Sequence, residues 1–258
     1  MFDGKYGFFD YKYNIAGYTG QDFDGVAQRI YLVASLIIIV VLLIILRKSN
    51  KEKVFKIVKY LGIFMTLMYI IKTTWESYYD IKLSGSFNTG LLPFDTCSIV
   101  MYACLIVGFG KGKIKDMATY WLMSGCIVGG IANMLYLNAF KYYPFFTFGA
   151  FYSMLWHLLM VFIGLLLIVH NKENISYKNM LYGYLFQVIF SLVIIPIDFI
   201  WDFDFMLYHY LGGVPIFEDL ASKMNMVYLN PLLMTLLYFI AFNIIYILGI
   251  GIKKALTR

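Results

Sequence analysis

A thiol, an imidazole and a carboxylate, which together could transfer an acyl group, lie in or beside apolar stretches of this chain. Cys97 and His157 each fall within a long apolar run, and Asp95 precedes Cys97 by two positions. An ionisable residue in a membrane-spanning run is costly, so a functional site is the first hypothesis for it. A thiolate paired with an imidazole can attack an ester carbonyl and hold the acyl group as a thioester.

The residues around Cys97 favour a reactive thiol. Pro93, Asp95 and Thr96 are typical of a helix start, which predicts that Cys97 lies in a first helical turn. Unpaired amides and the helix dipole there favour a thiolate, and the same amides could bind an oxyanion. The sequence therefore predicts Cys97 as a nucleophile with His157 as its base.

Structural interpretations of the same residues remain open. Cysteine is a common small apolar filler, and this is the interpretation for Cys104 and Cys126. A hydrogen bond to a neighbouring membrane helix would account for His157 without any catalysis. The three histidines show no ligand spacing and the three cysteines are too few for a metal cluster, so we predict no metal and no cofactor.

The elements that carry these residues are predicted to be membrane-spanning helices. The chain has 258 residues, of which 61% are hydrophobic and 14% charged. Its apolar residues form blocks of about 20, the length that crosses a bilayer. We expect an all-α, polytopic bundle in a single membrane domain, 1–258, with about seven spans at 26–46, 54–75, 91–107, 117–137, 149–169, 180–201 and 230–252.

The basic residues predict the orientation of the bundle. Fourteen of the 21 lysines and arginines fall in the first, third and fifth connections and the carboxyl-terminal tail, whereas twelve of the fifteen acidic residues lie on the other side. By the positive-inside rule, the amino terminus is outside and the carboxyl terminus inside. The net charge of +6 is thus a topology signal, and nucleic acid is not an expected partner.

Four further polar residues are predicted to line a substrate cavity in the outer half of the bundle. Gln187, Ser191 and Asp198 recur on one stripe of their helix, because eleven residues make about three turns. Asn133 approaches the same depth from the fourth span. Alternatively, Asn133 packs between helices and Asp198 is interfacial. The long outer connection, 202–228, has room for a lid or for contact with a membrane protein partner.

Short motifs resemble those of a known family. The residues Leu92-Pro93-Phe94-Asp95-Thr96-Cys97-Ser98, and Trp156-His157-Leu158 in the fifth predicted span, are similar to stretches of the bacterial YwaF family and its animal relative, transmembrane protein 164. The resemblance covers about 26–252. Asp95 stands where the family usually has histidine, and Asp204-Phe205-Met206 stands where it often has Asn-Tyr-Met.

The resemblance implies an activity. The animal relative is a phospholipid acyltransferase that uses cysteine and histidine, which implies here a cell-membrane protein with membrane phospholipids as substrates. Cys97 would be the nucleophile, His157 the base and Asp95 an orienting acid. The alternatives are an outward-facing binding or transport protein, whose cavity Asn133, Gln187, Asp198 and His157 would line, and a non-catalytic membrane subunit docked through the outer connection.

Overall fold

The computed structural model describes residues 7–11, 25–136, 139–210 and 229–256, and in this part of the chain all regular elements are helical. Seven stretches are long and apolar enough to cross a membrane, which confirms the predicted all-α polytopic bundle. The helices are α1 (Val26–Leu46), α2 (Lys51–Ser84), α3 (Ile99–Phe109), α4 (Gly112–Leu122), α5 (Gly125–Leu135), α6 (Ala139–Tyr142), α7 (Phe148–His170), α8 (Tyr177–Trp201) and α10 (Asn230–Leu256).

Two of the spans are less regular than the sequence predicted. In the third span, only α3 is α-helical. Two 3₁₀ turns, at Thr89–Leu91 and Thr96–Ser98, come before it. Pro93 lies between these turns and explains the break, since proline lacks an N–H and disfavours helix in the residue before it. The fourth span breaks at Ser124, whose backbone is not helical, into α4 and α5.

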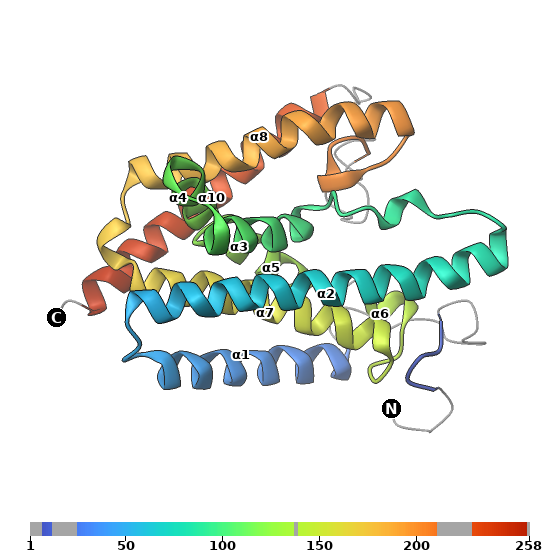
Figure 1. Ribbon diagram of the computed structural model, residues 1–258, viewed down its shortest axis with the longest axis horizontal. Coiled ribbons are helices and arrows are strands. Elements are labelled where there is room, and N and C mark those ends of the chain that lie inside the picture. Colours follow the sequence, from blue (N-terminus) through green and yellow to red (C-terminus); the bar gives the residue numbers. More distant parts are fainter. Residues whose placement is uncertain (1–6, 12–24, 137–138, 211–228, 257–258) are drawn as a thin grey trace.

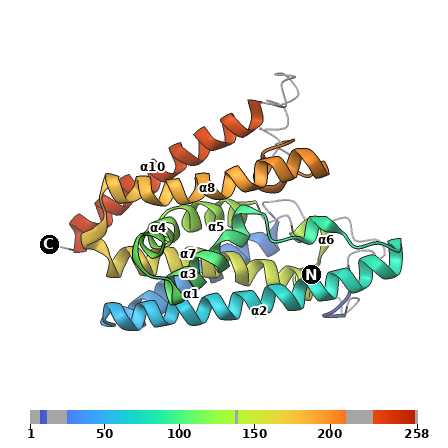
Figure 2. The same ribbon diagram turned by 45° about the horizontal axis from the view of Figure 1, so that its top comes forward.

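Helix α7 is the centre of the bundle (Figures 1 and 2). Two thirds of its most apolar window is buried inside the protein, compared with 17% for α1 and α10. The outward faces of α1, α2 and α10 carry exposed isoleucine, leucine and valine side chains, as expected for surfaces in contact with lipid. His157, the predicted base, therefore lies on the most buried of the spanning helices.

One end of the bundle collects the basic connections. The turn between α1 and α2, the end of α7 and the carboxyl-terminal end of α10 lie together at the left of Figure 1. Lys51 forms an ion pair of 2.8 Å with Glu173, and its ammonium lowers the pKa of that carboxyl. The ring of His170 contacts the carbonyls of Leu166 (3.0 Å) and Leu46 (3.1 Å). We call this the lysine-rich end; its location inside the cell stays a prediction.

A short amino-terminal segment, residues 7–11, packs on the opposite end. Tyr11 is fully buried, stacks on Tyr79 at 4.9 Å between ring centroids and donates a hydrogen bond to Asp80 of α2. The carbonyl of Phe8 accepts a hydrogen bond of 2.6 Å from the amide of Phe148 at the start of α7. Segment 7–11 thus joins the ends of α2 and α7.

Close helix crossings depend on glycine. At Gly183 of α8, a Cβ atom would lie 2.7 Å from the backbone carbon of Tyr120 in α4. At Gly130 of α5, it would lie 2.7 Å from Val161 Cγ2 and 3.2 Å from the carbonyl oxygen of His157. Small residues at such positions let helix backbones approach closely in membranes.

The substitution Gly183→Ala is expected to lower stability. The new methyl group would press on the backbone of α4, which cannot move aside as a side chain can, and overpacking of this kind costs about 1–3 kcal/mol. The control is Gly251→Ala in α10, because a Cβ there meets nothing within 4 Å. Thermal unfolding of the purified protein in detergent measures the difference. Equal midpoints for the two variants would contradict the observed α4–α8 packing.

Candidate functional site

Cys97 lies in the 3₁₀ turn Thr96–Ser98 that leads directly into α3, close to the predicted first helical turn. It is free and partly exposed, whereas Cys104 and Cys126 are free and fully buried. Its sulfur accepts a hydrogen bond of 3.3 Å from Nδ2 of Asn133 in α5. Its carbonyl accepts one of 3.0 Å from the indole N–H of Trp156 in α7.

Three helices hold the turn that carries Cys97. Gly129 of α5 faces it, and a Cβ at this position would lie 3.8 Å from the methyl carbon of Thr96. Asn133 is one turn further along α5 and so faces the same way. The hydroxyl of Thr96 forms a hydrogen bond with that of Tyr238 in α10. Contacts from α5, α7 and α10 therefore fix the position of the thiol.

His157 is buried in α7 with 7% of its surface exposed. Its Nδ1 donates a hydrogen bond of 2.7 Å to the carbonyl of Ser153, one turn earlier in the same helix. A carbonyl oxygen can only accept, so Nδ1 carries the proton and the neutral ring keeps its lone pair on Nε2. That nitrogen has no protein hydrogen bond in the described residues. The ring is in the tautomer that can act as a base.

Trp156, the neighbour of His157, contacts the carbonyl of Cys97, but the side chains of the predicted catalytic residues are not joined directly. In the described part of the chain, no hydrogen bond links the sulfur of Cys97 to the ring of His157. Asp95 is exposed at the start of the 3₁₀ turn and makes no capping hydrogen bond. The orienting partner of His157 is the Ser153 carbonyl. Asn133 and Trp156 are the side chains whose contacts with Cys97 the sequence did not predict.

The polar stripe on α8 is buried. Gln187, Ser191 and Asp198 are each at most 3% exposed. The carbonyl of the Gln187 side chain accepts a hydrogen bond of 2.7 Å from the indole of Trp121. The hydroxyl of Ser191 pairs with that of Tyr208, and Asp198 accepts a hydrogen bond of 2.9 Å from the amide of Phe205. All three side chains thus have protein partners.

Replacing Gln187 tests whether it is structural or binds substrate. Gln187→Leu should destabilise the protein by about 1–3 kcal/mol, because the buried indole N–H of Trp121 loses its acceptor. Adding Trp121→Phe removes the orphaned donor, so the double variant should lose less than the sum of the two single losses. Unfolding midpoints of the three variants give this comparison. Additive losses would mean that the two side chains are not coupled and that their hydrogen bond contributes nothing to stability.

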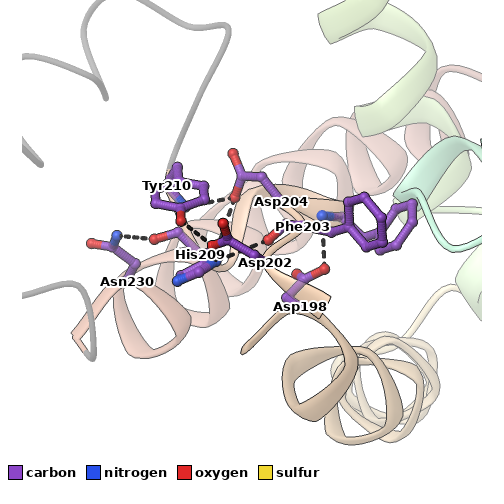
Figure 3. Close-up of polar contacts among 8 residues, drawn as sticks. Asp198, Asp202, Phe203, Asp204, His209, Tyr210 and Asn230 are labelled. Carbon is purple, nitrogen blue, oxygen red and sulfur yellow. Dashed lines mark hydrogen bonds and ion pairs between the residues drawn. The ribbon is translucent and has the colours of Figure 1, made fainter. Parts of the chain in front are cut away.

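The segment after α8 folds over the ends of α8 and α10 (Figure 3). One carboxylate oxygen of Asp204 accepts hydrogen bonds from the amides of His209 (2.9 Å) and Tyr210 (2.7 Å). Asn230, at the start of α10, donates to the carbonyl of His209 at 2.6 Å. Tyr210 donates to Asp202, which raises the pKa of this tyrosine. His209 is only 9% exposed.

The rest of the predicted outer connection, 211–228, lies outside the described residues, and so does its expected partner surface. Three residues near the start of the connection, Asp202, Met206 and Leu207, have positive φ. Such conformations are costly for side-chain-bearing residues and persist where the surroundings enforce them. Within the described chain, no three histidine, cysteine, aspartate or glutamate residues are grouped so that they could hold a metal ion.

Comparison with known proteins gives one match. The model of the TMEM164 family matches residues 25–252, which is most of the chain and includes Cys97, Asn133 and His157. No curated protein and no solved structure matches the chain. Because the matched region extends from the start of α1 into α10, the chain belongs to the TMEM164 family.

Proposed function

We propose that this multi-pass membrane protein transfers a fatty acyl group between membrane phospholipids through a thioester on Cys97, with His157 as the base. The observation that carries the proposal is the environment of Cys97. It is the partly exposed cysteine of the three, it lies in a turn that opens a helix, and an amide donates to its sulfur. The cell membrane is the proposed location.

The reaction would proceed in two balanced halves. The proton of the Cys97 thiol passes to Nε2 of His157, and the sulfur attacks the ester carbonyl carbon of the donor lipid. The resulting oxyanion collapses, the ester C–O bond breaks, and the leaving lysolipid takes the proton from His157. An acceptor hydroxyl then gives its proton to His157 and attacks the thioester, which releases the Cys97 thiolate to be reprotonated. No cofactor enters either half.

The geometry of the unliganded protein supports part of this scheme. His157 has the correct tautomer, and its ring nitrogen Nε2 is available to accept a proton. The sulfur of Cys97 accepts a hydrogen bond from Asn133 and makes none with His157, so the proposal requires Cys97 to turn toward His157 when substrate binds. Catalytic hydrogen bonds often tighten only in the substrate complex. The orienting role of Asp95 stays a prediction, because its carboxylate does not reach His157 by a hydrogen bond.

The binding or transport alternative rests on the polar residues of the interior. Two of them retain an unpartnered buried atom in the described chain, Nε2 of Gln187 and Oδ2 of Asp198. Both side chains nevertheless hold protein groups through their other atoms, as does Ser191. The observed contacts thus favour structural roles for this stripe. Substrate binding by Asn133, Gln187, Ser191 or Asp198 remains a prediction.

Acyl transfer in liposomes tests the proposal. The purified protein is reconstituted with a phospholipid that carries a deuterated acyl chain and with an unlabelled lysophospholipid of a different headgroup. The proposal predicts that the deuterated chain appears on the second headgroup at a rate proportional to protein. Protein-free liposomes and liposomes with heat-denatured protein are the controls. Equal label transfer in all three samples would contradict the proposed activity.

A further inference from the structure

We propose that the side-chain amide of Asn133 is the donor that stabilises the oxyanion formed at Cys97. This inference rests on the proposed function and deepens it, because it assigns to Asn133 a catalytic role in place of the predicted role in a substrate cavity. In the structure, Nδ2 of Asn133 donates to the sulfur of Cys97 at 3.3 Å. No other side chain in the described chain donates to this sulfur.

The position of the amide suits an oxyanion better than it suits the resting thiol. Sulfur is a weak hydrogen-bond acceptor, so the contact with the neutral thiol contributes little. When the sulfur bonds to an ester carbonyl carbon, the oxyanion lies only two bonds from the sulfur. A donor that already reaches the sulfur is then within reach of that oxygen. An N–H bond to an anion is roughly twice as strong as one between neutral groups.

The backbone around Asn133 is held in place before any substrate binds. Gly130 precedes it by one turn of α5 and packs so closely on α7 that a Cβ would lie 3.2 Å from the carbonyl oxygen of His157. At Gly129 the same helix packs against Thr96, whose methyl carbon would lie 3.8 Å from a Cβ at that position. The helix with the donor thus packs against the residue proposed as base and against the turn with the nucleophile. Such preorganised donors stabilise developing charge without reorganisation during the reaction.

An amide that stabilises the oxyanion can be distinguished by experiment from a residue that activates the thiol of Cys97. An oxyanion donor stabilises charge on the ester oxygen and transfers no proton. It therefore accelerates attack on an ester or thioester, in which such charge develops. It leaves alkylation by iodoacetamide almost unchanged, since that displacement forms no oxyanion. A residue that activates the thiol would affect both reactions.

The test compares both reactions in three full-length proteins: wild type, Asn133→Leu and Asn243→Leu. Leucine keeps the approximate size of asparagine and removes the donor. Asn243 is the matched control, because it is a partly buried amide within α10 that donates to the carbonyl of Phe239 at 2.8 Å. Acylation of Cys97 by a fatty acyl p-nitrophenyl ester and alkylation by iodoacetamide are followed by intact-protein mass spectrometry.

The inference predicts that Asn133→Leu slows acylation by about 10²- to 10³-fold, as loss of one oxyanion donor does. Alkylation should stay within a few-fold of wild type, and Asn243→Leu should resemble wild type in both reactions. Asn133→Ser, which places a shorter donor at the same point, should recover part of the acylation rate. If Asn133→Leu does not fold, the serine variant is compared with wild type in its place.

Three results would overturn the inference. Equal losses of acylation and alkylation in Asn133→Leu would show that Asn133 acts on the thiol itself. Unchanged acylation would show that the amide only packs. A wild-type Cys97 that is alkylated but never acylated would overturn the proposed function, and the oxyanion role with it. The first two results leave the thioester on Cys97 intact, so the two failures are distinguishable.

Discussion

Cys97→Ser should abolish acyl transfer between lipids, with a loss of more than about 10³-fold, as when an enzyme loses its nucleophile. A serine hydroxyl is far less acidic than a thiol and is a weak nucleophile without strong activation. The change is small in volume, and the fold should persist because the carbonyl of residue 97 still receives the hydrogen bond from Trp156. Label transfer in liposomes measures the effect.

Cys126→Ser is the matched control for this variant. Cys126 is fully buried, and its thiol donates to the carbonyl of Met160 at 3.1 Å, a bond that a serine hydroxyl can also make. Cys126→Ser should therefore keep its activity. If Cys97→Ser transfers the labelled chain as fast as Cys126→Ser does, the thioester mechanism is excluded.

His157→Gln should reduce transfer by about 10²- to 10⁴-fold, the usual contribution of a general base. Glutamine is of similar size and can donate to the Ser153 carbonyl as histidine does, but it cannot take up a proton at neutral pH. The comparison variant is His170→Gln at the lysine-rich end, where the two ring nitrogens contact backbone carbonyls. Rates are normalised to folded protein. A His157→Gln variant with wild-type rate would show that His157 is structural.

Much of the helical architecture could be predicted because membrane spans leave a strong signal. Block hydrophobicity located the helix boundaries of α1, α7, α8 and the start of α10 within a few residues. The interruptions in the third and fourth spans were not predicted. Pro93 was visible as helix punctuation, yet the break at Ser124 depends on how α4 and α5 pack against α7 and α8, and hydropathy does not report packing.

The sequence indicated candidate site residues but not the contacts that they make. The sequence indicated Cys97 through its helix-start motif and His157 through the cost of an ionisable group in a span. It could not show that Asn133 binds the sulfur, because that contact joins residues on α5 and the turn before α3. The signal that could have indicated it is the pair Gly129 and Gly130, one turn before Asn133.

For the stripe on α8, too, the sequence indicated the residues but not their contacts. Its period of about 3.6 correctly placed Gln187, Ser191 and Asp198 on one buried face. Periodicity gives the face but not the partner. The indole of Trp121, the hydroxyl of Tyr208 and the amide of Phe205 come from other segments and occupy these side chains. Their contacts follow from tertiary packing.

Intact-protein mass spectrometry after incubation in phospholipid liposomes tests the thioester on Cys97 most directly. The thioester mechanism predicts that the wild-type protein gains the mass of one acyl chain, that hydroxylamine removes it, and that peptide mapping places it on Cys97. His157→Gln should acquire the same adduct more slowly. A wild-type protein with no adduct and no change in lipid composition, or an adduct that persists in Cys97→Ser, would contradict the thioester mechanism.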